Sequence, residues 1–279
     1  MSSHNKLLVV GSTGFLGSAL VRELKTDGTD RSQIDLLKFS QTNVDAVLAR
    51  GFSHVAICAA ATDIEFCFKN PTVSHQINVA GTIKLLERIW HAGAVPIFFS
   101  TDYAFAPKES PHAEDDEKKP LTLYGKQKLE VENFIQRSFD KFLVFRTSKL
   151  MSMELHAKNI LRPVVQNLKE NKPLKLFEDQ WLNPVFVEDI VKVIEKSMQA
   201  DISGCFHLGT KQIFSRAGLA RHIADELGLD RSLIQSGYMK DIVTSEPRPH
   251  HNTLNCEKIE TALQFEFTEV GERALANLS

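Results

Sequence analysis

Short apolar runs alternate with helical patterns through the first half of the chain. The runs are nearly continuous in hydrophobic residues, as in strands buried on both faces of a parallel sheet, and they lie at 6–10, 54–60, 95–100 and 142–145. Between them, apolar residues recur at helical spacing, which predicts helices at 16–24, 71–93 and 121–139. This alternation predicts an α/β fold, a Rossmann-type doubly wound parallel sheet with right-handed crossovers.

The rhythm changes after residue 150. Helical patterns follow at 154–170, 188–199, 215–227 and 256–264, with short extended pieces at 174–177 and 204–209 and long loops between them. We therefore expect a dinucleotide-binding Rossmann domain at 1–150 and a smaller, partly interleaved α/β substrate-binding lobe at 151–279.

Composition narrows the class of protein. The 279 residues carry a net charge of −2 and are 43% hydrophobic, the balance of an ordinary globular protein. No global field draws the chain to nucleic acid, and no apolar run approaches the ~20 residues that span a bilayer. Four scattered cysteines and an amino terminus without an apolar leader suit a cytoplasmic protein. We expect no nucleic-acid and no membrane partner.

A glycine pattern follows the first predicted strand. Gly11 permits a tight turn, Gly14 lets backbone amides approach a phosphate, and Gly17 allows close packing of helix on sheet. The helix that opens there adds the partial positive charge of its N-terminus. The position between strand and helix predicts a site for a dinucleotide pyrophosphate.

The segment that normally selects the dinucleotide is short and polar. Residues 25–34 look turn-like, and no acidic residue at the end of a second strand can be named for the adenosine ribose. The basic residues Lys25, Arg31 and Lys38 favour NADP(H) over NAD(H), although they also suit ordinary surface charge. A degraded site that binds no dinucleotide is a further alternative.

Tyr124 and Lys128 are one helical turn apart in the helix predicted at 121–139. A phenol titrates near pH ~10. An ammonium group ~5 Å away would lower the pKa of Tyr124 by about two units at an effective dielectric of about 20. The pair therefore predicts an acid-base tyrosine.

Several motifs in a common order resemble the extended short-chain dehydrogenase/reductase superfamily, and within it the dTDP-4-dehydrorhamnose reductase group of nucleotide-sugar reductases. After the glycines come Ala59-Ala60-Ala61, Asn78, the stretch 100–103, Tyr124-x-x-x-Lys128 and the stretch 146–148. Looser matches continue through 179–184, 187–190 and 248–254.

The resemblance implies NAD(P)H-dependent reduction of a nucleotide-linked 4-keto-6-deoxy sugar. Tyr124 would protonate the carbonyl oxygen, Thr101 would hydrogen-bond it, and Lys128 would bind the nicotinamide ribose, with Asn78 in a water-linked proton path. Relatives with this fold often form homodimers.

The resemblance also implies two sets of binding residues. The dinucleotide would contact Gly11, Thr13, Gly14, Phe15, Leu16, Gly17, Asp35, Leu36, Ala59, Ala60, Ala61, Tyr124 and Lys128. The sugar nucleotide would contact Asp102, Tyr103, Gln180, Trp181, Asn183, Arg248 and Asn252.

Other functions compete with the reductase. A dehydratase of this superfamily carries Glu where this chain has Tyr103, and an epimerase is a related alternative. A non-catalytic dinucleotide-binding partner, like the regulatory subunit of methionine adenosyltransferase, shares the fold. His250-His251 has no third ligand at a suitable spacing, so we expect no metal site. The charged run 114–119 is interpreted as a solvated loop.

Overall fold

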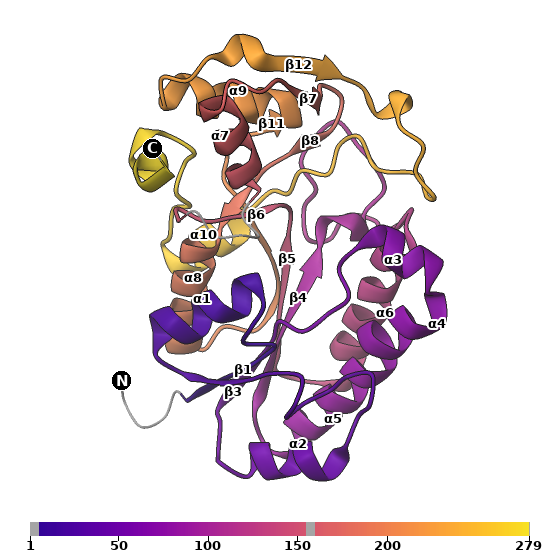
Figure 1. Cartoon of the computed structure of the whole chain (residues 1–279). Coiled ribbons are helices and arrows are strands. Elements are labelled where there is room, and N and C mark those ends of the chain that lie inside the picture. The colour runs from indigo at the N-terminus through magenta and orange to yellow at the C-terminus, as the bar shows by residue number, and fades with distance from the viewer. Residues whose placement is uncertain (1–5, 155–159, 279) are drawn as a thin grey trace.

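A six-stranded parallel sheet forms the centre of the protein. In the computed structural model, which describes residues 6–154 and 160–278, the strand order is β10-β5-β4-β3-β1-β2. All neighbouring pairs run parallel (Figure 1), and the strands are β1 (Leu7–Val10), β2 (Asp27–Thr29), β3 (His54–Ile57), β4 (Val95–Thr101), β5 (Leu143–Thr147) and β10 (Gly204–Leu208). This is the predicted doubly wound sheet.

Helices cover both faces of the sheet (Figure 1). One face carries α1 (Phe15–Leu24), α8 (Val187–Gln199) and α10 (Glu257–Leu263). The other carries α2 (Gln41–Leu48), α5 (Thr82–His91) and α6 (Leu123–Ser138). Each layer buries its own apolar cluster against the strands, so the strands are apolar on both sides. β10, α8 and α10 belong to the sheet and its layers although they follow residue 150.

A smaller lobe lies beyond the carboxyl ends of the strands (Figure 1). Its helices are α7 (Leu161–Lys169), α9 (Arg216–Glu226) and α11 (Glu272–Leu275). Its short strands pair as β7 (Leu174–Phe177) with β12 (Ile234–Gly237), β8 (Trp181–Leu182) with β11 (Phe214–Ser215), and β6 (Leu150–Met151) with β9 (Val185–Phe186). A separate apolar cluster holds this lobe together.

The remaining helical elements are short. α3 (Ile64–Lys69) and α4 (Pro71–His75) precede a π-helix, Gln76–Gly81, that runs into α5. Short 3₁₀ turns occupy Asp102–Ala104, Arg231–Leu233, Met239–Asp241 and Ala276–Leu278. The helix predicted at 71–93 is thus continuous but passes through a π segment. Within the helix predicted at 154–170, the structure shows α7 at Leu161–Lys169. Residues 155–159 lie outside the described residues.

The second strand is the main correction to the sequence analysis. Residues 27–29 form β2 beside β1, where we expected only a polar turn. The Thr29 carbonyl accepts hydrogen bonds from the amides of Gly11 (2.9 Å) and Ser12 (3.0 Å). A Cβ on Gly28 would stand 2.5 Å from the Ser12 Cβ, which leaves no room for a larger residue. Close packing against the glycine turn therefore requires small residues in this edge strand. Such a strand has no hydrophobic pattern by which the sequence could reveal it.

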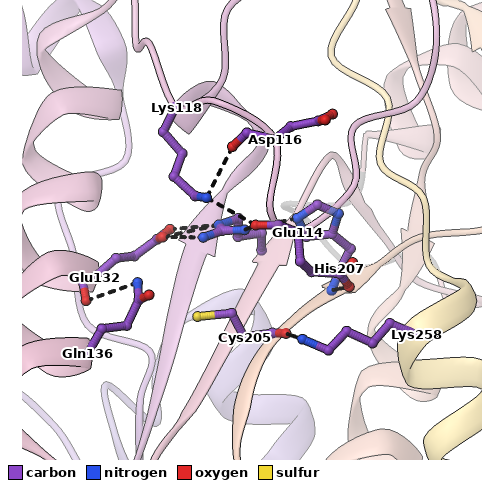
Figure 2. Close-up of polar contacts among 9 residues, drawn as sticks. Glu114, Asp116, Lys118, Glu132, Gln136, Cys205, His207 and Lys258 are labelled. Carbon is purple, nitrogen blue, oxygen red and sulfur yellow. Dashed lines mark hydrogen bonds and ion pairs between the residues drawn. The ribbon is translucent and has the colours of Figure 1, made fainter.

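A buried ion pair fixes α6 to β5 (Figure 2). The Arg146 guanidinium donates from Nη2 to Glu132 Oε2 at 2.6 Å, and both side chains are almost inaccessible to solvent. Arg146 Nη1 also donates to the Glu114 carbonyl (3.1 Å) and lies 3.1 Å from His207 Nε2. The Glu114 carboxylate accepts from the His207 amide at 3.0 Å. The 114–119 run is therefore not merely solvated, because its residue Glu114 joins this buried cluster.

Glu132→Ala should lower the free energy of unfolding by about 3–5 kcal/mol, since it leaves the buried Arg146 charge unpaired. Chemical denaturation with circular dichroism measures this change. The double variant Glu132→Leu/Arg146→Met removes both charges and should lose much less. Equal losses in the single and double variants would contradict this view of the pair.

Candidate functional site

Two adjoining cavities open at the carboxyl ends of the strands. One, of about 450 Å³, is bordered by Phe15, Leu16, Thr101, Tyr124 and Lys128 among others. The other, of about 480 Å³, is bordered by the glycine turn and by Asp35, Leu36 and 59–61. Both include Gly14, Cys58, Ala60 and Thr62, so they form one continuous depression. It lies at the end of β1, which has β2 on one side and β3 on the other. The order of the strands reverses direction there, and doubly wound sheets bind ligands at such a switch point.

The glycine turn is shaped for close backbone approach. Gly11 has φ +89°, and a Cβ there would lie 2.7 Å from the Ala59 amide nitrogen. A Cβ on Gly17 would lie 2.2 Å from the Gly11 carbonyl oxygen, so Gly17 supports the turn from behind and does not border the cavity. Thr13 and Gly14 border the cavity at the start of α1, whose first amides lack a side-chain cap. This cradle fits a dinucleotide pyrophosphate.

The far end of the second cavity contains an acid that the sequence analysis missed. Asp30 follows β2 directly and borders the cavity beside Arg31. Arg31 Nε donates to Asp35 Oδ2 at 3.2 Å, while one Asp30 oxygen accepts from the Ser32 amide at 2.8 Å. The usual spacing of about 20 residues from the first glycine could have identified Asp30. Lys25 and Lys38 do not border this cavity.

Three predicted catalytic residues meet at the first cavity. Thr101 is the last residue of β4, and its hydroxyl donates to Asp102 Oδ1 at 3.0 Å. Tyr124 lies in the first turn of α6, which is capped by the Thr122 side chain. Lys128 is one turn further along the same buried face. A Cβ on Gly125 would lie 2.3 Å from the Tyr103 carbonyl oxygen, so glycine lets the helix start against that backbone.

The pKa of Tyr124 shifts in the direction opposite to the expected one, and Lys128 is not among the groups that shift it most. Burial raises the pKa of Tyr124 above its ordinary value, the Asp102 charge adds to this, and a hydrogen bond with Thr101 opposes it. The Lys128 ammonium donates to the Phe99 carbonyl at 2.8 Å and stands 4.5 Å from the Phe98 ring centroid. Burial lowers the pKa of Lys128 to about 8. At neutral pH Tyr124 is therefore a neutral phenol, the form that donates a proton.

Asn78 borders neither of the two adjoining cavities. It lies in the π-helix, where its Oδ1 accepts from the Ala61 amide (2.8 Å) and its Nδ2 donates to the Ala61 carbonyl (2.9 Å). Nδ2 also donates to Gln127 Oε1 at 2.8 Å. These contacts fix the backbone of Ala61, which borders the second cavity, and they tie the π-helix to α6. In the structure Asn78 is thus a helix residue bonded to nearby backbone, and no contact of a proton path to the cavity is seen among its described partners.

Most of the predicted substrate residues meet at a third, almost filled cavity of about 10 Å³. Asp102, Tyr103, Gln180, Trp181 and Asn252 all border it. Asn183 does not, because its amide donates to the Thr210 (3.1 Å) and Leu254 (2.9 Å) carbonyls. Its Oδ1 also accepts from the Leu254 amide at 2.9 Å, so Asn183 holds the loop behind the cavity.

Two cations of this region were not predicted. Lys149 follows β5, and Arg216 opens α9 and bonds Gln180 through its Nε. Burial lowers the pKa of both side chains, and the neighbouring positive charge of Arg248 lowers each pKa further. No motif distinguished them from surface charge in the sequence, because only the packing of the lobe against the sheet brings them together.

The structure also bears on metal binding and on membrane spans. Within 6–154 and 160–278, no three His, Cys, Asp or Glu side chains gather as metal ligands would. Over those same residues, every helix is too short or too polar to cross a bilayer. His250 Nδ1 lies 3.0 Å from the Asp179 carbonyl, and His251 stacks on Trp181 with ring centroids 5.6 Å apart.

The family model described as the RmlD substrate binding domain matches residues 5–277. The chain belongs to this family. The match confirms the resemblance to the dTDP-4-dehydrorhamnose reductase group of extended short-chain dehydrogenases/reductases.

Relatives of different function match almost the whole chain. The β subunit of methionine adenosyltransferase 2 from Danio rerio is 27% identical and covers 92% of this chain and 84% of its own length. A probable low-salt glycan biosynthesis reductase from Haloferax volcanii is 26% identical over 91% of each chain. The crystal structure of Bacillus anthracis dTDP-4-dehydrorhamnose reductase in complex with NADP has a TM-score of 0.88 at 20% identity, covering 98% of this chain and 97% of its own. It confirms the fold.

Asp102→Asn should make the stability of the protein less sensitive to pH. Burial raises the pKa of Asp102 to about 6, so the wild type loses stability as pH rises from about 4 through 6. The loss relative to the variant should reach about 3 kcal/mol by pH 8, as expected for a shift of about two pKa units. Urea denaturation at pH 4.5, 6 and 8 measures it. The exposed Asp115→Asn serves as control, and parallel pH curves for wild type and Asp102→Asn would contradict the prediction.

Proposed function

We propose that the protein reduces the keto group of a nucleotide-linked 4-keto-6-deoxy sugar with NAD(P)H, as an oxidoreductase of the dTDP-4-dehydrorhamnose reductase type. The observation that carries this proposal is the meeting of Thr101, Tyr124 and Lys128 at one cavity that continues into the glycine cradle. The NADP complex of a structural relative supports a nicotinamide dinucleotide as cofactor.

The dinucleotide would lie along the glycine turn and 59–61, and its dihydronicotinamide would supply the hydride when bound. Tyr124 would give its phenolic proton to the carbonyl oxygen as charge develops there. Thr101 lies beside Tyr124, and its hydroxyl would turn from Asp102 to donate a second hydrogen bond to the same oxygen. Lys128 would bind the nicotinamide ribose and stabilise the phenolate that remains. Burial of all three side chains keeps water from competing with these contacts.

The third cavity would hold the sugar nucleotide. Asp102 and Tyr103 would face the sugar, and Gln180, Trp181 and Asn252 would contact the nucleotide. Arg216, Arg248 and Lys149 would balance the charge of the diphosphate, which arginine binds with its planar fork. Asn183 and Asn78 would not contact the ligands and would hold the backbone of the segments that border the cavities. Tyr103 has no carboxyl group to expel water, which favours reduction over dehydration.

A second function has one specific observation in its favour. The regulatory subunit of a methionine adenosyltransferase matches this chain as well as a reductase does. A protein of that class would bind the dinucleotide without turnover. The intact set of Thr101, Tyr124 and Lys128 favours the reductase. The expected cytoplasmic location and homodimer stay predictions from the sequence.

Asp30 bears on the choice of dinucleotide. Its carboxylate would accept a hydrogen bond from the 2′-hydroxyl of NAD(H) and would repel the 2′-phosphate of NADP(H). Arg31, the residue in this cavity best suited to a 2′-phosphate, is already paired with Asp35. We therefore infer a preference for NAD(H), opposite to the preference for NADP(H) that the basic residues favoured in the sequence.

Tyr124→Phe should lower kcat by about 10²–10⁴-fold, because it removes the proton donor and leaves the binding residues intact. Loss of reduced-dinucleotide absorbance on a panel of nucleotide 4-keto sugars measures it. The exposed Tyr238→Phe is the matched control. Undiminished turnover by Tyr124→Phe would exclude the acid assignment, whereas dinucleotide binding without turnover by the wild type would favour the regulatory function.

Asp30→Asn should raise the ratio of kcat/KM for NADPH to that for NADH by about tenfold, because it removes a negative charge beside the 2′-phosphate. Steady-state kinetics with both dinucleotides measure the ratio. Asp140→Asn, an exposed carboxylate at the distant end of α6, is the control. A wild-type enzyme that prefers NADPH, together with an unchanged ratio in Asp30→Asn, would refute the role of Asp30.

A further inference from the structure

Glu65 connects the two lobes across the mouth of the site. It lies in α3, directly after the 59–63 segment of the dinucleotide cavity. Its carboxylate accepts hydrogen bonds from the Ser245 hydroxyl at 2.6 Å and from Arg248 Nη2 at 2.9 Å. Ser245 and Arg248 belong to the loop at 238–252, which leads to Pro249 and Asn252 at the third cavity. These partners hold the pKa of Glu65 below its usual range, so the carboxylate is ionised at neutral pH.

Arg248 uses only part of its hydrogen-bonding capacity in this arrangement. Nη2 bonds Glu65, but Nε is buried and has no partner among the described residues. Glu65 accepts from only one nitrogen of the guanidinium, so the Nε donor stays unused. A diphosphate has enough oxygens to accept from two nitrogens at once. The side chain is 18% exposed, and Arg248 directly precedes Pro249, which borders the third cavity, so a ligand bound there would lie near it.

Arg248 lies in a cluster of positive charges that an anion would stabilise. Arg216 and Lys149 lie close enough that the charge of Arg248 lowers the pKa of each, in addition to the effect of burial. Arg248 also lies near Tyr103, where burial raises the pKa of the phenol and the charge of Arg248 lowers it. Asp102 and Glu65 are the carboxylates that partly balance these three cations among the described contacts. A diphosphate would complete the balance.

The third cavity is nearly filled in this state. Its volume is about 10 Å³, Trp181 stacks on His251, and Arg216 is bonded to Gln180. Because Trp181 and His251 also share a backbone bridge, the 238–252 loop and β8 fill the space together. A cavity of this volume has no room for a sugar nucleotide, so binding there requires the loop or β8 to shift, and Glu65 holds the loop to α3.

We propose that Glu65 is a positioning residue that holds Arg248 and the 238–252 loop in a resting position, from which the substrate diphosphate displaces it. The inference rests on the proposed nucleotide-sugar substrate. Glu65 competes with the ligand for Arg248, so it lowers affinity for nucleoside diphosphates in general. Ligand binding releases the carboxylate, and the loop closes over the ligand through Arg248.

The test is binding of dTDP to the whole protein by calorimetry, without any turnover. Glu65→Gln keeps the size of the side chain and removes its charge, and it should bind dTDP about three- to fivefold more tightly than the wild type. In an Arg248→Gln background, the same change should have no effect, because the competition is gone. Trp181 fluorescence in a Trp90→Phe background should change on dTDP binding as the stack with His251 opens.

Glu178→Gln is the matched control. Glu178 accepts hydrogen bonds from Arg221 and from the Ser236 hydroxyl, the same chemistry as Glu65, but it does not border the three cavities of the site. Its substitution should leave dTDP affinity unchanged. Equal or weaker binding by Glu65→Gln would overturn the inference. If the wild type binds none of dTDP, UDP and GDP, the proposed substrate class fails first, and the role of Glu65 falls with it.

Discussion

The seating of α6 on the sheet is the constraint on which the rest of the site depends. Tyr124, Lys128 and Glu132 recur every four residues on the buried face of this helix. Glu132 is bound to Arg146 of β5, and Lys128 is bound to the backbone of β4. These two contacts fix the height and rotation of α6, so the phenol at its first turn stands beside the end of β4. Thr101 ends that same strand, which explains why the two hydroxyls reach one cavity.

The sequence predicted the parts of the fold whose hydrophobic pattern is strong, and these were the buried strands and the helices that cover them. It missed β2 because an edge strand under a glycine turn needs small and polar residues, which read as loop. Asp30 was missed with it. Motif order brought Thr101, Tyr124 and Lys128 together correctly. Arg216 and Lys149 could not be found, since packing of one lobe on the other decides their positions.

Burial explains where the chemistry expected from sequence and the observed electrostatics differ. Spacing alone placed an ammonium beside a phenol, but it could not give the cost of removing both from water. In the structure that cost dominates, so the pKa of Tyr124 rises and that of Lys128 falls. The neutral phenol suits reduction, in which a proton must be given away. The same burial makes the phenolate costly, so it must regain a proton before the next turnover.

The relation between enzyme and regulatory subunit can be argued from the same contacts. The side chains of Asn78 and Asn183 hydrogen-bond to backbone. Asn78 holds Ala61 at the second cavity, and Asn183 holds the loop behind the third cavity. A protein that only bound a dinucleotide would need the first of these supports and the glycine turn. It would have no use for a buried proton-donating phenol beside the Thr101 hydroxyl, or for the cluster of Lys149, Arg216 and Arg248. Keeping these charges out of water lowers stability, and a substrate with a diphosphate would give them a function.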